Sequence, residues 1–217
     1  MIDEMLPLPQ RLALHYAPGP ARAPTLALLA LDARLSELVA KANEPLLAQL
    51  RLAWWRDELG KPQAERARGD PVLDALEAWA GEEQALAGLV DGWEQLIGDA
   101  PLPTSSLEKF ADGRGNAFAA LARLTGQGQS AKAAGHAARI WALADFAAHS
   151  SNAEERSTAL QLGGALARRA GAKLPRPLRA VAVLRGLGRR AIERGGGPLV
   201  GGRRDVLATM RLGMLGR

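Results

Sequence analysis

The sequence predicts an all-α protein, a single-domain helical bundle over residues 1–217. Valine, isoleucine and threonine are sparse, and no run alternates apolar and polar side chains around a hairpin turn, so strands are not expected. Glycine and proline instead separate segments that have the apolar spacing of helices. A chain of 217 residues, of which 47% are hydrophobic, can bury one sizeable core, and no internal repeat or linker divides it.

The first helices follow a proline-rich opening. A short helix is expected around Gln10–Tyr16, and a longer one over Thr25–Ala42 with Thr25 as its N-cap. A third helix over Pro45–Leu59 starts at a proline, which is tolerated in the first turn. Residues 60–71 form a polar connection. Further helices are expected over residues 71–80, 82–97, 105–124, 131–150, 153–171, 176–194 and 203–215.

The net charge of +5 conceals an uneven distribution along the chain. Residues 173–217 carry eleven Lys and Arg residues against two acidic ones, a net charge of +9, whereas the preceding 172 residues carry −4. Residues 195–217 form a glycine- and arginine-rich basic tail. A basic end attracts the phosphates of nucleic acid, lipid head groups or a diphosphate ligand. A solvated arginine-rich surface explains the same pattern equally well.

Several classes of function and location are excluded or disfavoured. The chain has no cysteine, so disulfides, thiolate metal sites and cysteine nucleophiles are absent. No apolar stretch approaches the roughly 18 residues that a membrane-spanning helix needs, and the acidic start shows no secretory signal. We expect a cytoplasmic location, with room for peripheral attachment to the inner membrane.

One carboxylate stands out because it lies on an apolar helix face. On the helix expected over 25–42, Asp32 falls within the stripe formed by Leu28, Leu35 and Val39. A carboxylate on a buried face is costly unless it is paired, binds a metal or opens onto a wet cavity. The simplest interpretation is an internal ion pair with an arginine of a neighbouring helix such as Arg51. The alternative is a role facing a ligand.

The helix expected over 45–59 is apolar around most of its circumference. Leu46, Leu47, Leu50 and Trp54 form one stripe, and Leu52, Trp55 and Leu59 form a second. We therefore expect this helix to be central, with both tryptophans in the core rather than stacked on nucleobases.

Asp145 and His149 lie four residues apart on the helix expected over 131–150. The two side chains can bind one metal ion or orient the imidazole. Because no third ligand is near them in the sequence, a solvated pair on the helix surface is the favoured interpretation.

Several segments resemble the squalene/phytoene synthase family. The run from Ala27 to Asp32 is followed by Glu44-Pro45 and by the stretch Arg-Leu-Ala-Trp-Trp-Arg-Asp-Glu-Leu over residues 51–59. Residues 11–16 resemble the opening of that family, and residues 135–146 resemble its later glycine-containing helix. The resemblance covers residues 10–195 and is strongest in 11–59. The Glu-Pro pair and the double tryptophan are closest to a branch that resembles a mitochondrial respiratory complex I assembly factor.

The resemblance implies an all-α fold of the isoprenoid-synthase type around a central cavity. Active members condense two prenyl diphosphates, and two aspartate-rich motifs hold the Mg²⁺ that neutralises the leaving diphosphate. Here the first motif falls on residues 36–40, which keep only Glu37. The second falls on residues 146–150, which keep no acid, although a shift of one residue recovers Asp145. The resemblance therefore implies a scaffold that has lost most of its metal ligands.

Three functions are compatible with the sequence. The favoured one is a catalytically degenerate protein, a pseudoenzyme without a cofactor, that binds a prenyl lipid or prenyl diphosphate or serves as an assembly scaffold for a partner protein. The first alternative is an active prenyltransferase with an unusual Mg²⁺ site. The second is a basic protein that binds an anionic membrane surface through residues 173–217, nucleic acid being the less favoured partner.

The same resemblance and helix faces suggest a set of pocket residues but no catalytic or metal-binding residue. Asp32 is expected to line the cavity, Arg51 to pair with it or meet a phosphate, and Trp55 and Tyr16 to help wall the pocket. The full set of candidates is Tyr16, Asp32, Ser36, Arg51, Trp55, Asp145 and His149.

Overall fold

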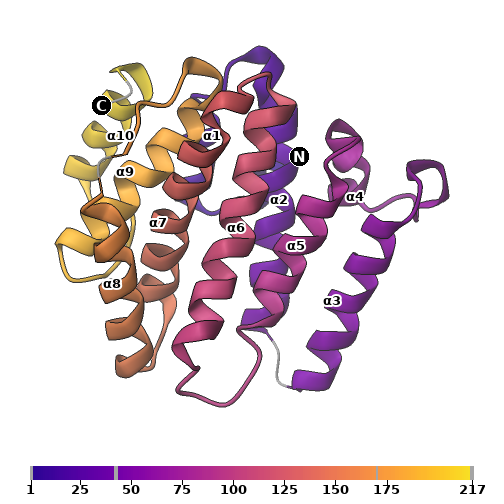
Figure 1. Ribbon diagram of the computed structural model, residues 1–217, viewed down its shortest axis with the longest axis horizontal. Coiled ribbons are helices and arrows are strands. Elements are labelled where there is room, and N and C mark those ends of the chain that lie inside the picture. The colour runs from indigo at the N-terminus through magenta and orange to yellow at the C-terminus, as the bar shows by residue number, and fades with distance from the viewer. Residues whose placement is uncertain (1, 42–43, 170, 216–217) are drawn as a thin grey trace.

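The computed structural model is a bundle of α-helices (Figure 1). It describes residues 2–41, 44–169 and 171–215, and within these ranges it contains ten α-helices and no strand, which confirms the all-α prediction. The helices are α1 (Leu8–Leu14), α2 (Gly19–Ala40), α3 (Pro45–Gly60), α4 (Pro71–Ala75), α5 (Glu83–Glu94), α6 (Thr104–Leu124), α7 (Ala131–His149), α8 (Ala153–Ala167), α9 (Arg179–Glu193) and α10 (Arg203–Leu215).

The start of α2 differs from its prediction. The helix begins at Gly19 rather than at Thr25, so Thr25 is not the N-cap, and Pro24 lies inside the helix. Proline removes one backbone hydrogen bond there, but Pro24 and Thr25 are buried, and the Thr25 hydroxyl donates to the Ala21 carbonyl oxygen over 2.6 Å. The burial of Pro24 and Thr25 thus outweighs the tendency of proline to interrupt a helix. The expected end of this helix at Ala42 lies outside the described residues.

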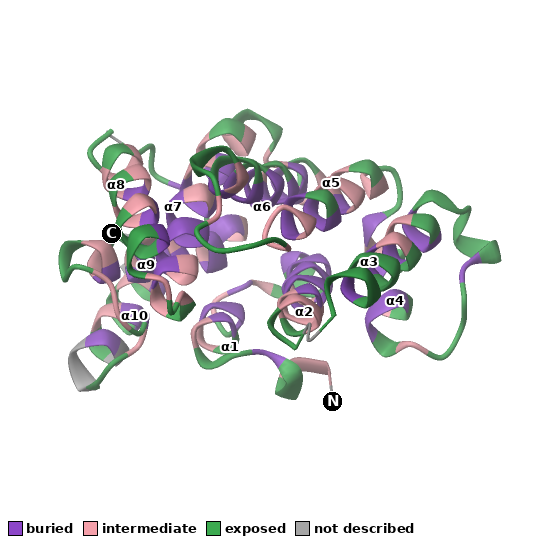
Figure 2. Cartoon of the chain, turned by 90° about the horizontal axis from the view of Figure 1, so that it is seen from below, coloured by how far each residue is buried: buried purple, intermediate pink, exposed green. Residues whose placement is uncertain are grey.

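Helices α5, α6 and α7 lie side by side, and α2 runs along α5 and α6 in a second layer (Figures 1 and 2). Viewed from below, the buried faces of these helices turn toward one another, and the exposed faces form the outside (Figure 2). Burial of this apolar surface is the main favourable contribution to folding. The largest fully buried apolar side chains are Trp79, Trp141, Phe110 and Phe118, together with leucines of α1, α2 and α3.

Glycines set the spacing of α6 from its two neighbours. A Cβ atom added to Gly113 would lie 2.8 Å from the Gly88 carbonyl oxygen and 3.1 Å from Cα of Gly92, both on α5. On the other side, a Cβ atom added to Gly135 of α7 would lie 2.9 Å from the Gly115 carbonyl oxygen. Three helix backbones therefore come within contact distance of one another. The residue between the two α6 glycines is held at the centre of this layer.

Helix α3 lies at the edge of the molecule, so the expectation that it is central is wrong (Figure 1). The stripe containing Leu52, Trp55 and Leu59 is buried, whereas the other stripe is exposed. Trp54 is 40% exposed, and it is not a core residue. The three leucines of that stripe, Leu46, Leu47 and Leu50, are 67%, 48% and 59% exposed.

The C-terminal helix α10 packs on α9 and α1. A side chain at Gly186 would collide with Leu212, and one at Gly213 would collide with the ring of Tyr16. Asp205 accepts hydrogen bonds from Arg190 over 3.2 Å and from Arg194 over 2.9 Å. Every helix in the described part of the chain is either too short or too polar to span a lipid bilayer.

Candidate functional site

A buried cluster of three charged side chains lies between α2, α6 and α7. Arg114 of α6 contacts both carboxylate oxygens of Asp32 on α2, with Nε and Nη2 each donating over 2.8 Å. The remaining terminal nitrogen, Nη1, donates to Asp145 of α7 over 2.8 Å. The side chains of Arg114 and Asp32 are each 1% exposed. One guanidinium therefore holds two carboxylates that come from different helices.

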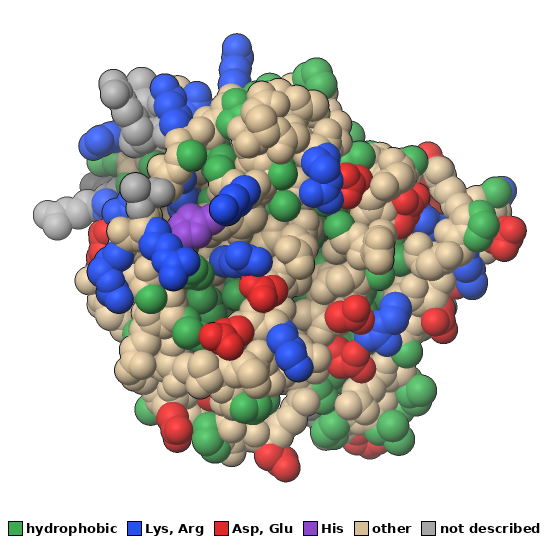
Figure 3. Space-filling view, in the orientation of Figure 1, with side chains coloured by type: hydrophobic (Ala, Val, Ile, Leu, Met, Phe, Trp, Pro, Cys, Tyr) green, Lys and Arg blue, Asp and Glu red, His purple; other side chains and the backbone are tan. Residues whose placement is uncertain are grey.

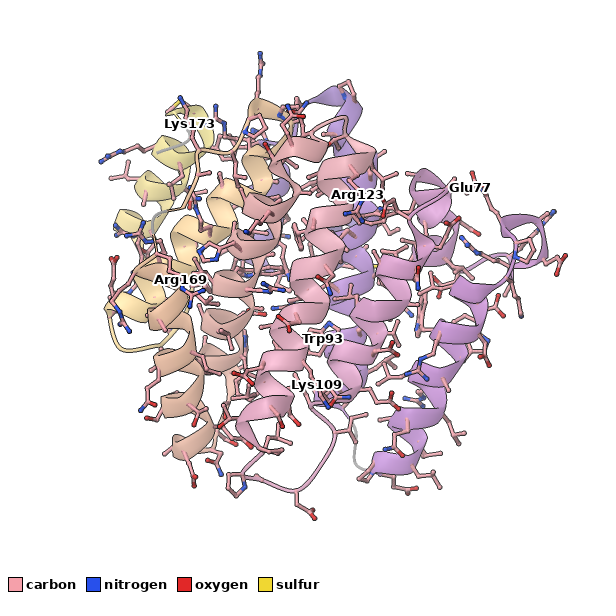
Figure 4. The ribbon with its side chains drawn as sticks, viewed as in Figure 1. Glu77, Trp93, Lys109, Arg123, Arg169 and Lys173 are labelled. Carbon is pink, nitrogen blue, oxygen red and sulfur yellow. The ribbon has the colours of Figure 1, made fainter. Side chains whose placement is uncertain are left out.

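Aromatic rings enclose the guanidinium. Its carbon atom lies 4.2 Å from the ring centre of Trp141 and 4.9 Å from those of Trp93 and Phe110. Such contacts attract a cation to the ring faces. Trp93, labelled in Figure 4, projects from α5, and its Nε1 donates to Asp32 over 2.9 Å. The cluster is thus satisfied by hydrogen bonds and shielded from water by side chains of three helices.

The electrostatics of this cluster favour a charged arginine. Burial alone would lower the pKa of Arg114, but the charges and hydrogen bonds of Asp32 and Asp145 raise it above its ordinary value. Burial raises the pKa of Asp32, and Arg114 and the Trp93 N–H oppose that effect. Three N–H groups point at the two oxygens of Asp32. An ionised carboxylate, which only accepts hydrogen bonds, suits this arrangement.

Two pockets lie on either side of the solvent-facing edge of the cluster, and Ser36, Asp145 and His149 line both of them. The first, which we name the α5 pocket, has a volume of about 350 Å³ and is further lined by Val39, Ala40, Trp93, Leu96, Gly98, Leu102, Phe110, Phe146, Ser150, Ser151 and Glu155. The second, which we name the α1 pocket, has a volume of about 400 Å³ and is further lined by Pro7, Leu8, Pro9, Gln10, Trp141, Ala148, Pro198, Leu199 and Val200.

Two polar atoms in the lining of the α1 pocket lack partners. Gln10 and Trp141 are 4% and 1% exposed, and neither Gln10 Oε1 nor Trp141 Nε1 has a hydrogen-bond partner. Buried polar groups without a partner carry a free-energy penalty. The wall of this largely apolar pocket therefore contains one unused acceptor and one unused donor, and because both atoms are buried, a ligand reaches them only when these side chains turn toward it.

The structure brings together four of the seven candidate residues. Ser36, Asp145 and His149 line both pockets, and Asp32 lies beneath them in the ion cluster. The His149 ring nitrogen Nδ1 lies 2.8 Å from the backbone oxygen of Asp145 and 3.6 Å from its carboxylate, and the His149 side chain is 79% exposed.

The other three candidates lie elsewhere. Arg51 is exposed on α3, so the expectation that it pairs with Asp32 is wrong, and Arg114 takes that place. Tyr16 packs against Gly213 of α10, and Trp55 lies on the buried face of α3. None of these three lines either pocket. Because α3 lies at the edge of the molecule, its residues Arg51 and Trp55 are separated from the ion cluster (Figure 1).

Sequence reasoning missed Arg114, Trp93, Trp141 and Gln10. A signal for Arg114 exists, since it stands between two glycines in the middle of a long helix, where glycine is unfavourable unless backbones must approach closely. The two tryptophans and the glutamine carry no such signal.

The side chains present do not fit the Mg²⁺ ions that the family resemblance implies. Both oxygens of Asp32 and one oxygen of Asp145 are bound by Arg114, whereas Mg²⁺ requires free oxygen ligands. Glu37, the acid kept in the first motif, is exposed and pairs with Lys41. Within the described ranges, no group of three or more His, Asp or Glu residues is placed to hold a metal ion.

Comparison with known proteins assigns the chain to a family. The family model of squalene/phytoene synthase matches residues 11–194, a range that contains Asp32, Arg114 and Asp145. No curated protein and no solved structure gives a significant match. A match over most of the chain establishes that this protein belongs to the squalene/phytoene synthase family.

Proposed function

We propose that this protein is a catalytically degenerate member of its family that binds an uncharged prenyl lipid and does not condense prenyl diphosphates. The observation that carries the proposal is the position of Arg114, whose guanidinium occupies the carboxylates that would otherwise be available to metal ions. Three of its nitrogens donate to carboxylates of the same chain.

Because Arg114 is bound to Asp32 and Asp145, these carboxylates are not free for Mg²⁺ and the arginine is not free for a phosphate. Diphosphate chemistry depends on one or the other. A diphosphate leaves only when its developing charge is neutralised, by Mg²⁺ on carboxylates or by positive side chains. Here Arg114 is fully compensated by two carboxylates, so it has no positive charge to spare for a diphosphate. With one guanidinium against two carboxylates, the cluster has a small negative net charge, which repels an anionic ligand. An electrically neutral ligand suits such a site better than a diphosphate.

The α1 pocket supports a lipid with an oxygen-containing head. Its lining contains prolines, leucines and a valine, and two of its residues carry buried polar atoms without a partner, the acceptor Gln10 Oε1 and the donor Trp141 Nε1. When these side chains turn toward the pocket, a hydroxyl group can serve either atom, because it donates one hydrogen bond and accepts others. The apolar chain would then lie along the remaining pocket wall. A prenyl alcohol has this combination of groups.

A binding experiment with farnesol tests the proposal. Because Trp93 and Trp141 line the pockets, saturable binding is expected to change tryptophan fluorescence. The Ala148→Phe variant should fill the α1 pocket and weaken binding at least about tenfold. The Ala165→Phe variant is the matched control, because Ala165 is exposed on α8 and lines neither pocket. Equal binding by the two variants would contradict the proposal.

A turnover experiment tests the loss of catalysis separately. The wild-type protein, farnesyl or geranylgeranyl diphosphate and Mg²⁺ are incubated together, and release of pyrophosphate is measured. We expect no release above that of the protein-free mixture. Release that depends on both Mg²⁺ and Asp32, and that is lost in the Asp32→Asn variant, would show that the protein is an active prenyltransferase.

A further inference from the structure

The outward face of α10 is apolar. Leu207, Met210 and Met214 follow one another at helical spacing, and they are 64%, 46% and 68% exposed. The opposite face packs against the body of the protein through Leu212 and Gly213. The helix is therefore fixed in place by one face, while the other presents three large apolar side chains to solvent.

Positive charge surrounds this face. Residues 173–217 carry a net charge of +9. Their only two acids already have partners: Glu193 lies 3.5 Å from Arg189, and Asp205 is bound by two arginines. Arg211 of α10 and Arg185 of α9 contact no carboxylate among the described residues.

The figures show how far this basic region extends. In Figure 3, Lys and Arg side chains gather over the side of the molecule formed by the C-terminal helices, and acidic side chains lie mainly elsewhere. Arg169 and Lys173, labelled in Figure 4, lie on the same side, at the end of α8 and in the segment that follows it. Leu207 of the exposed α10 face lines one groove together with Arg189, Arg190 and Arg211 and with a single acid, Glu193, so arginines lie directly beside this face.

We propose that α10 docks on an anionic lipid membrane, with Leu207, Met210 and Met214 inserted among the lipids and the neighbouring arginines against the head-group phosphates. A helix with an apolar face and a basic surround lies in the membrane interface, and its affinity combines burial with electrostatic attraction. The occupant follows from charge complementarity. This inference does not depend on the proposed prenyl-lipid pocket, because it concerns a different surface of the protein.

Helix α3 provides a contrast within the same molecule. It also exposes Leu46, Leu47 and Leu50, but α3 itself carries two arginines and two acidic residues, so its charge is balanced. The structure gives no electrostatic reason for α3 to prefer an anionic surface. The two exposed stripes are therefore matched in apolar character and differ in their surrounding charge.

Vesicle co-sedimentation tests the proposal with the full-length protein. We expect at least tenfold stronger binding to vesicles of phosphatidylcholine and phosphatidylglycerol (7:3) than to phosphatidylcholine alone. Replacing Leu207, Met210 and Met214 together by Gln preserves charge and helix propensity and should weaken binding about tenfold or more. The Arg211→Gln variant should weaken it about fivefold. Replacing Leu46, Leu47 and Leu50 by Gln should leave binding unchanged.

A fluorescent label separates insertion from a loss of folding. Because the chain has no cysteine, the variants Met210→Cys and Leu50→Cys each provide one site for an environment-sensitive dye. On anionic vesicles the dye at position 210 should brighten and shift to the blue, and the dye at position 50 should not. Equal responses at the two positions, equal binding to both vesicle types, or undiminished binding by the triple α10 variant would overturn the proposal. Tighter binding to a 20-base-pair DNA duplex than to anionic vesicles would also overturn it.

Discussion

Arg114 and Asp32 meet at the centre of the molecule although 82 residues separate them in the sequence. Removing these charges from water is costly, and the two hydrogen bonds between them return part of that free energy. The Trp93 N–H donates to Asp32, and the rings of Trp93, Phe110 and Trp141 enclose the guanidinium. A buried ion pair of this kind contributes little net stability, but breaking it leaves an uncompensated charge.

The first prediction compares the removal of one charge of the pair with the removal of both. The Arg114→Met variant should lose about 3–5 kcal/mol of unfolding free energy, because Asp32 then stays buried without its partner. The double variant Asp32→Leu, Arg114→Met should recover most of that loss, since no unpaired charge remains at the buried position. Urea denaturation followed by circular dichroism measures both. A single variant within 1 kcal/mol of the wild type would show that the pair is not buried in solution.

The same residues show what sequence could and could not reveal about the site. Asp32 was identifiable because a carboxylate on an apolar helix face demands a partner. The sequence suggests Arg51, an arginine of the next helix along the chain, as its partner, whereas the arginine that binds it, Arg114, comes from α6. Helical periodicity shows which way a side chain points but not which distant helix lies there. Asp145, found through its spacing from His149, belongs to the cluster through that same Arg114.

At the scale of elements, close contact between helix backbones creates the site. Gly113 contacts α5 and Gly115 contacts α7, so the side chain of Arg114 between them extends into a narrow space. Wider separation of α5 would withdraw Trp93 from Asp32. The glycines destabilise α6 as an isolated helix, and the tertiary contacts that they allow compensate for this loss.

The second prediction tests this role of glycine. The Gly113→Ala variant should lose about 1–3 kcal/mol of unfolding free energy, because the added methyl group meets the Gly88 carbonyl oxygen 2.8 Å away, and backbone atoms cannot rotate aside. Gly88→Ala is the matched control on α5. A Cβ atom there meets nothing within 4 Å, so this variant should gain up to about 1 kcal/mol. Destabilisation of the two variants by equal amounts would argue against close backbone packing.

The helices themselves were largely predictable, and their placement was less so. Glycine and proline mark most of the helix ends, because they interrupt helices for local reasons. Two predictions failed where tertiary contacts decide. Burial extends α2 through Pro24 to Gly19, and α3 buries only one of its two apolar stripes. The sequence of α3 alone does not reveal whether another helix packs on its second apolar stripe.

At the scale of the whole molecule, the chain closes on itself, because α10 packs beside α1. Asp205 is central to the packing of α10 on α9. It accepts hydrogen bonds from Arg190 and Arg194 of the α9 region and from the Gly201 amide over 3.0 Å. The residue is 6% exposed. It thus anchors the start of α10 and, with it, the surface that we propose to meet the membrane.

The third prediction concerns the effect of pH on this anchor. Burial alone would raise the pKa of Asp205, but the Gly201 amide and the two arginines lower it below its ordinary value of 3.8. A carboxyl group whose pKa is lower in the folded state adds stability above its unfolded pKa. That stability disappears as the pH falls through the folded pKa. The contribution of Asp205 should therefore be complete at pH 5 and above and should decline below about pH 4.

Comparison with the Asp205→Asn variant isolates this contribution from general acid unfolding. At pH 7 the variant should be less stable by about 1 kcal/mol, because both arginines are partly exposed and solvent weakens the ion pairs. Below pH 4 the difference in unfolding free energy between the two proteins should shrink, since the wild-type carboxyl group becomes protonated. The exposed Glu193→Gln variant serves as the control and should change stability little at either pH. A difference that stays constant from pH 7 to pH 3 would mean that Asp205 does not hold α10 through its charge.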